Sequence, residues 1–335
     1  MVASLSIRRA EPEDASALIA AIVDCYGDTY VEYEALEVDR LRGLLAAERS
    51  IYYLAEVAGA VVGQIALEEV TPGLFLHCRA VVRDDYRGRG LMARMSAPLL
   101  GPEARRLGAR LILGSSVTQH LATQRFNVRA GFQPLGLLLG IYPGIRPRGV
   151  PDSSQSVSGL LMGLPVEADP APRRPRLPAW LMPRVERTYA ALGIPLAPAA
   201  PSHSAGALGW SVDWHRDSGR CMWRFAPGLA SPWPVQRELA RATGEGARVF
   251  WADLPLEHPQ APALIEHLQA LGFSYGALVP CAGAQGADVL RFQRCLEPLQ
   301  AAPIKVLPQL ASLRDRTLAE HTAARAGAPR VGGAA

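Results

Sequence analysis

The feature that most constrains the fold is a strand, a turn and a helix start that follow one another in residues 73–92. An apolar run of β-favouring residues ends at Val82, and the next residues, around Asp84 and Gly88, have the composition of a turn. A helix is predicted to begin at Leu91. A strand that enters a helix through a short turn is typical of proteins with mixed α and β structure.

Two glycines remove side chains where the chain enters this helix, at Gly88 and Gly90. The first backbone N–H groups of a helix have no partner within it and lie at the positive end of its dipole, so they bind phosphate well. Arg87 and Arg89 add positive charge there. No third glycine completes a dinucleotide fingerprint, and the Lys-Ser/Thr pair of a nucleotide triphosphate loop is missing.

The run Arg87-Gly88-Arg89-Gly90, after a strand end at Ala80-Val81-Val82, resembles the acyl-CoA-binding motif of the GNAT N-acetyltransferase family. That motif reads Arg/Gln-x-x-Gly-x-Gly/Ala, and Met92 stands where the family prefers a small residue. The resemblance implies acetyl-CoA as co-substrate. It implies cofactor contacts from Ala80, Val81, Val82, Arg87, Gly88, Arg89, Gly90, Leu91, Met92, His120 and Asn127.

The predicted element order over residues 4–166 is the GNAT order: strand, helix, helix, three strands, helix, strand, helix, two strands. Gly131-Phe132 resembles the Gly-Phe that ends the family's fourth helix. Counting back, His120 stands where the family often has Asn. Asn127 stands where it often has the Tyr that protonates the departing CoA sulfur. The resemblance therefore implies an α/β fold class, with a mixed α+β sheet of GNAT type.

Residues 206–298 are predicted to be a degenerate second copy of this fold. Residues 247–251 and 275–279 mirror residues 109–113 and 135–139, and Gly272-Phe273 mirrors Gly131-Phe132. Residues 226–232, where a phosphate turn would lie, contain two prolines and no Arg-x-x-Gly. We expect a GNAT domain at 1–168, a Pro-rich linker with one helix at 169–205, the degenerate half at 206–298, and a C-terminal helix with a disordered tail at 299–335.

Acetyl transfer needs an oxyanion donor and a base for the amine proton. By resemblance, the donor is a backbone N–H near Val81 or Val82. On strand alternation, Phe75, His77, Arg79 and Val81 share one face, and Cys78 lies opposite, with Ala80, as a core residue.

Three side chains are candidates for the base. His77 is either the base or a histidine satisfied by its neighbours. Glu68 is either the base or a solvated carboxylate. His120 either caps a helix, contacts CoA or faces the acceptor.

Composition excludes several classes of function. The net charge of +4 over 335 residues gives no case for nucleic acid, and the longest apolar run is too short to cross a membrane. The five cysteines are scattered, with no metal-ligand spacing, which indicates reduced thiols and no metal. No signal peptide is visible, so a cytoplasmic location is expected.

The sequence therefore predicts an N-acetyltransferase that moves an acetyl group from acetyl-CoA to an unidentified amine by direct attack in a ternary complex. The alternative is a non-catalytic, acyl-CoA-binding regulatory module. A protein-interaction scaffold is a third hypothesis, favoured by the Pro-rich linkers. Formation of a homodimer is left open.

Overall fold

The computed structural model describes residues 4–30, 37–169, 171–199, 206–229 and 234–327. Most of the tail predicted to be disordered, and residues 230–232 of the predicted degenerate turn, lie outside these ranges.

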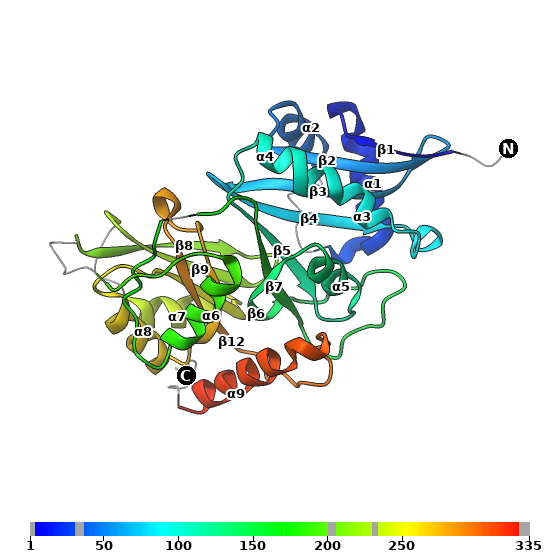
Figure 1. The fold of residues 1–335 in the computed structure, drawn as a ribbon. Helices are drawn as coiled ribbons and strands as arrows, with labels where there is room; N and C mark the ends of the chain where they lie inside the picture. Colours follow the sequence, from blue (N-terminus) through cyan, green and yellow to red (C-terminus); the bar gives the residue numbers. More distant parts are fainter. Residues whose placement is uncertain (1–3, 31–36, 170, 200–205, 230–233, 328–335) are drawn as a thin grey trace.

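The first half has the element order that the sequence predicts (Figure 1). Its elements are β1 (Leu5–Arg9), α1 (Ala15–Tyr26), α2 (Val38–Ala46), β2 (Ser50–Val57), β3 (Ala60–Thr71), β4 (Leu74–Val82), α3 (Leu91–Pro98), α4 (Ala104–Arg106), β5 (Leu111–Val117), α5 (Ala122–Arg129), β6 (Gln133–Tyr142) and β7 (Val157–Pro165). Helix α3 ends at Pro98 and is followed by a π-helical segment, Leu99–Glu103, which contains Pro102.

The second half follows with α6 (Met182–Leu192), β8 (Leu208–His215), β9 (Arg220–Pro227), α7 (Val235–Gly244), β10 (Val249–Pro255), α8 (Ala261–Ala270), β11 (Ser274–Val279), β12 (Val289–Cys295) and α9 (Ala311–Gly327). Helix α6, which lies in the predicted linker, packs into this half, because Leu181, Val185 and Tyr189 belong to its hydrophobic core.

The described strands form one sheet in the order β1-β2-β3-β4-β5-β7-β6-β11-β12-β10-β9-β8. In the first half β4 and β5 are parallel, and β7 lies between β5 and β6 with antiparallel pairing on both sides. The second half repeats this pattern with β9, β10, β12 and β11. The topology therefore has the tandem arrangement that the sequence predicts, with the two halves meeting at β6 and β11.

The junction between the halves depends on a close backbone approach. Gly136 on β6 pairs with Ala277 on β11, and a Cβ at Gly136 would lie 2.0 Å from the carbonyl oxygen of Gly276. The buried amide of Gln293 on β12 reaches across, accepting from Leu139 N–H at 2.8 Å and donating to the Leu137 carbonyl at 2.9 Å. Helix α9 also packs on both β11 and β6 (Figure 1).

Two layers of helices cover the first half of the sheet. Helices α1 and α2 pack on one face, which we call the α1 face, through a core that contains Leu18, Leu41 and Ala66. Helix α3 packs on the other, which we call the α3 face, through Leu91 and Met95. The candidate site lies where the sheet opens between these layers.

Candidate active site

A cavity of about 530 Å³ opens where β4 and β5 separate. The two strands pair from Leu74 and Leu111 as far as His77 and Gly114, and no later residue of β4 pairs with β5 among the described residues. Residues 76–82 of β4 and Ser115 and Val117 of β5 line the cavity. β4 and β5 therefore part beyond His77 and Gly114.

A β-bulge in β4 decides which side chains face the cavity. The pairing with β3 slips between Cys78 and Val81, and Arg79 takes a left-handed backbone conformation with φ of 54°. The predicted common face for Phe75, His77, Arg79 and Val81 is therefore wrong. Val81 packs on the α1 face with Ile22 and Cys25, whereas Phe75 packs on the α3 face.

Cys78 and Ala80 do not share a face either. Cys78 packs against the α1-face core, and Ala80 packs against the α3-face core. Because the extra residue in the bulge shifts the alternation by one, every prediction based on a period of two fails beyond Arg79.

The amino end of α3 opens onto the cavity. Gly88 and Gly90 have φ of 77° and 72°, which favours glycine, and both line the cavity. Within the described ranges, the backbone N–H groups of residues 88–92 have no protein acceptor. Leu91 and Met92 also line the cavity, so the methionine that departs from the GNAT motif borders the same space.

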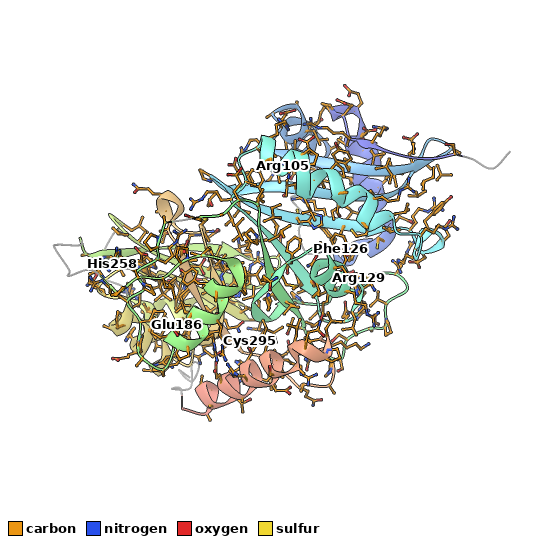
Figure 2. The ribbon with its side chains drawn as sticks, in the orientation of Figure 1. Arg105, Phe126, Arg129, Glu186, His258 and Cys295 are labelled. Atoms are coloured by element: carbon orange, nitrogen blue, oxygen red, sulfur yellow. The ribbon has the colours of Figure 1, made fainter. Side chains whose placement is uncertain are left out.

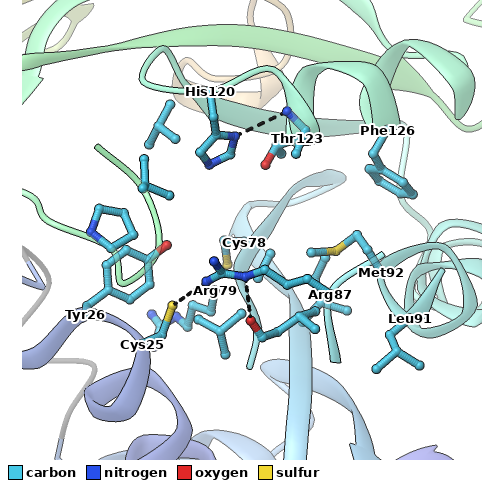
Figure 3. Close-up of a pocket in the computed structure, with 18 of the residues that line it drawn as sticks. Cys25, Tyr26, Cys78, Arg79, Arg87, Leu91, Met92, His120, Thr123 and Phe126 are labelled. Atoms are coloured by element: carbon cyan, nitrogen blue, oxygen red, sulfur yellow. Dashed lines mark hydrogen bonds between the residues drawn. The ribbon is translucent and has the colours of Figure 1, made fainter. Parts of the chain in front are cut away.

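Arg87 does not present its charge to a ligand as the sequence suggests. Its guanidinium turns back to donate to the carbonyls of Val82 at 3.1 Å and Arg148 at 3.0 Å, and it pairs with Asp84 at 2.5 Å. Figure 3 shows this side chain beside Cys25, whose Sγ lies 3.8 Å from Nη2. Arg87 therefore anchors the loop before α3. Arg89 lies over the Tyr86 ring and donates to the Asp85 carbonyl.

His77 is a buried imidazole on the α3 face. Its Nε2 lies 3.1 Å from Ser96 Oγ, and its ring stacks on Phe126 of α5, which is labelled in Figure 2. Burial lowers the pKa of His77 to about 3. A group with this pKa is a weak proton acceptor at neutral pH, so the environment favours the reading of a satisfied histidine over that of a base.

We expect the protein to lose stability in mild acid because of two buried histidines. Burial lowers the pKa of His77 to about 3 and that of His321, on α9, to about 4. Because the unfolded chain binds these protons near pH 6.5, stability is complete above that pH and falls as the pH drops toward 4. Each histidine should contribute about 1.4 kcal/mol of loss per pH unit in that window.

Urea unfolding at pH 7.5, 6.0 and 5.0 measures this loss. His321→Gln should remove about half of it, and His267→Gln, at an exposed position on α8, should leave it unchanged. A wild-type stability that is flat between pH 7.5 and 5.0 would show that the histidines are not neutral in the folded protein.

Glu68, the second candidate base, does not line the cavity. Its carboxylate accepts from Arg79 at 3.0 Å and from Ser50 Oγ at 2.7 Å. This pair fixes the Arg79 side chain beneath the bulge. The structure therefore places Glu68 as a partner of a cavity residue and not in the cavity itself.

His120, two residues before α5, and Asn127, in the carboxyl half of that helix, do line the cavity. His120 Nδ1 accepts from the Ala122 N–H at 3.3 Å, which is the capping contact considered from the sequence (Figure 3). Burial, with smaller effects from the charges of Arg87 and Lys305, lowers the pKa of His120. Asn127 Nδ2 donates to Ser116 Oγ at 3.0 Å, so the amide that replaces the family's Tyr is held on β5.

The C-terminal segment braces this helix. The fully buried Gln124 donates to the carbonyl of Lys305 at 2.8 Å and accepts from the Leu307 N–H at 3.1 Å. Its Nε2 also donates to the His120 carbonyl at 3.3 Å. A segment 181 to 183 residues away from Gln124 in sequence therefore helps to position His120, and no local motif indicates this contact.

Sequence reasoning missed the polar residues on the α1 face of the cavity. Tyr142, at the end of β6, and Ser115 share a hydrogen bond of 3.0 Å, and both line the cavity. Tyr26, the last residue of α1, and Tyr30, which follows the next turn, line it as well. These residues come from elements that meet only in the folded sheet, and none carries a sequence motif of its own.

In the part of the chain that the structure describes, no group of three or more His, Cys, Asp or Glu side chains is placed to hold a metal ion. No described helix has both the length and the apolarity that a membrane crossing requires.

No family model matches this sequence, and no curated protein matches it. Among solved structures it is similar to YncA from Salmonella typhimurium with its cofactor acetyl-CoA, at 18% identity over 51% of this chain and 98% of that one, with a TM-score of 0.41. It is also similar to an N-acetyltransferase from Staphylococcus aureus, at 17% identity over 49% of this chain and 99% of that one, with a TM-score of 0.40.

A third similar structure is an acetyltransferase of the GNAT family from Streptococcus pneumoniae, at 19% identity over 49% of this chain and 100% of that one, with a TM-score of 0.38. The similar structures are thus GNAT-type acetyltransferases that match about half of the chain. At these identities and TM-scores the likeness carries no further argument, and the case for a function comes from the site itself.

Proposed function

We propose that this protein is an acetyl-CoA-dependent N-acetyltransferase that transfers the acetyl group to an amine by direct attack in a ternary complex. The observation that carries the proposal is the amino end of α3, whose amides lie beside a cavity between two diverging strands. Such amides bind a diphosphate, and the gap between the strands admits an extended thioester arm. Residues 88–92 would hold the diphosphate, and residues 78–82 would flank the arm.

Acetyl transfer requires the protein mainly to hold the amine and the thioester close together. The amine nitrogen attacks the thioester carbon, the carbonyl oxygen gains negative charge, and the carbon–sulfur bond then breaks. A backbone N–H near Val81 or Val82, on the part of β4 that has left β5, would stabilise the oxygen. His120 is the histidine of the cavity whose ring is not fully buried, and we propose it as the group that receives the amine proton, directly or through water.

A second function also has support, because two residues depart from the GNAT motif and the candidate base His77 is unsuited to that role. Asn127 replaces a tyrosine, His77 is neutral and buried, and Met92 borders the phosphate end of the cavity. A module that binds acyl-CoA and regulates another protein without turnover would have the same phosphate site. It would need neither a base for the amine nor an acid for the departing sulfur.

One experiment separates the two functions. Calorimetry measures acetyl-CoA binding to the full chain, and a thiol-detection assay measures CoA release with a panel of primary amines, amino acids and peptides. Binding with amine-dependent thiol release supports the transferase. Binding without release with every amine supports the regulatory module, and no binding contradicts both.

A further inference from the structure

A tyrosine and a serine that line the cavity form a hydrogen bond across a strand that lies between them. Tyr142 is on β6 and Ser115 is on β5, and β7 lies between these strands. Even so, the Tyr142 hydroxyl lies 3.0 Å from Ser115 Oγ. The ring of Tyr142 must therefore cross β7 to make this contact.

A glycine in β7 makes room for that crossing. A Cβ at Gly159 would lie 3.1 Å from Ser115 Oγ and 3.4 Å from Cε2 of Tyr142, and 2.6 Å from Cδ1 of Ile141. Gly159 pairs with Val117, two residues beyond Ser115, and its φ is not in the left-handed region. Glycine is therefore needed here for packing and not for backbone conformation. The Tyr142–Ser115 pair occupies the space that a side chain at position 159 would fill.

Ser115 stands at the point where the strands part. The last paired residue of β5 opposite β4 is Gly114, so Ser115 is the first β5 residue beside the gap. Its side chain points to the α1 face, because its neighbours contact α5 on the α3 face: Asn127 donates to Ser116, and a Cβ at Gly114 would touch Asn127. The Tyr142 hydroxyl thus reaches the gap through which a thioester would pass.

We infer that Tyr142 is a catalytic residue that donates its proton to the departing thiolate, and that Ser115 is a positioning residue that orients its hydroxyl. This inference rests on the proposed function. The amine nitrogen forms a bond to the acyl carbon, the carbon–sulfur bond breaks, and the sulfur takes the proton of the Tyr142 hydroxyl. The amine proton passes to His120, directly or through water, and from there to solvent, from which the tyrosinate regains a proton, so the products are the amide and CoA thiol.

The inference also accounts for Asn127. This residue stands where the resemblance expects a tyrosine on α5, on the α3 face, and an amide cannot donate a proton to a thiolate as a phenol does. Tyr142 would bring a phenol to the same gap from the opposite face of the sheet. Both positions face the cavity, so the exchange needs no change in the fold.

Tyr142→Phe tests the inference, because it removes only the hydroxyl. With the amine that gives the fastest thiol release, kcat should fall about 100-fold, which is within the range for loss of a general acid. The Kd for acetyl-CoA, measured by calorimetry, should stay within about twofold, as expected for a group that acts on the leaving sulfur. Tyr53→Phe, on β2 and outside the cavity, is the matched control and should leave both values unchanged.

Two more variants test the arrangement. Ser115→Ala should lower kcat about tenfold, with Kd unchanged, since the Tyr142 hydroxyl then loses its hydrogen bond to Ser115. Gly159→Ala should also lower kcat while the tyrosine is still present, because the new methyl group occupies the space beside its ring. If Gly159→Ala does not fold, Tyr142→Phe still decides the question.

A kcat for Tyr142→Phe within twofold of wild type would overturn this inference alone and would leave the transferase intact. A wild-type protein that binds acetyl-CoA and releases no thiol with any amine would overturn the proposed function as well. The two failures are therefore distinguishable in the same set of assays.

Discussion

Replacing Gly90 with valine should raise the Kd for acetyl-CoA about 100-fold and abolish measurable thiol release. Gly90 has φ of 72°, and a Cβ there would meet no atom within 4 Å. The cost is therefore one of backbone conformation, roughly 2 kcal/mol for a side chain in the left-handed region. The loop can relieve this strain only by turning the amides of residues 88–92 away from the phosphate position, and losing one or two charge-assisted hydrogen bonds costs about 3 kcal/mol of binding energy.

The chain offers a close control for this variant. Gly193, at the end of α6, has φ of 69° and also has no atom within 4 Å of its ideal Cβ. Gly193→Val should therefore lose a similar amount of stability by thermal unfolding and bind acetyl-CoA as wild type does. If Gly90→Val binds acetyl-CoA with wild-type affinity, the amino end of α3 is not the diphosphate site and the enzyme assignment loses its basis.

Replacing Gly136 with alanine should destabilise the protein by about 3 kcal/mol or more. The added methyl group would lie 2.0 Å from the Gly276 carbonyl oxygen and 2.6 Å from Ala277 Cα, and these are backbone atoms that cannot rotate away. β6 and β11 would have to separate, and with them the pairing that joins the two halves into one sheet. Urea unfolding of the full chain measures the loss.

Gly43 on α2 is the control for the same chemical change. A Cβ there meets nothing within 4 Å, so Gly43→Ala should be neutral or should stabilise the helix by up to about 1 kcal/mol. β6 also carries Tyr142, so a shift of this strand would move the tyrosine. The Gly136→Ala protein that remains folded should therefore show a lower kcat than wild type. A Gly136→Ala protein as stable as wild type would mean that the β6–β11 junction is looser than the structure describes.

Much of the first half was predictable because its signals are local. Gly131, for example, follows the end of α5 with a positive φ, a conformation that glycine adopts readily. The repeat in the second half was visible because each strand–helix–strand unit keeps its own apolar pattern. The Gly88 and Gly90 turn was recognisable for the same reason, since its glycines supply the positive φ that it needs.

The site itself was only partly predictable. The alternation of side chains along a strand predicted that His77, Arg79 and Val81 share one face. A β-bulge in β4 breaks this alternation, and no residue type in β4 indicates a bulge. The role suggested for Arg87 depended on its charge, but the folded chain brings Asp84 and the Arg148 carbonyl to that guanidinium. Glu68 is not placed to act as the base, because its hydrogen bonds to Arg79 and Ser50 hold its carboxylate outside the cavity.

The sequence alone determined the order of the elements, the helix start with unpaired backbone N–H groups, and the second, altered copy of the fold. Each of these follows from backbone preferences and apolar periodicity over a few neighbouring residues. Only the tertiary structure decided which polar side chains share the cavity. Tyr142 reaches Ser115 across Gly159, and Gln124 ties His120 to the C-terminal segment, and both contacts join strands or segments that are far apart in the chain. Their physical cause is the pairing of the sheet, which brings together residues whose own sequence neighbourhoods carry no sign of one another.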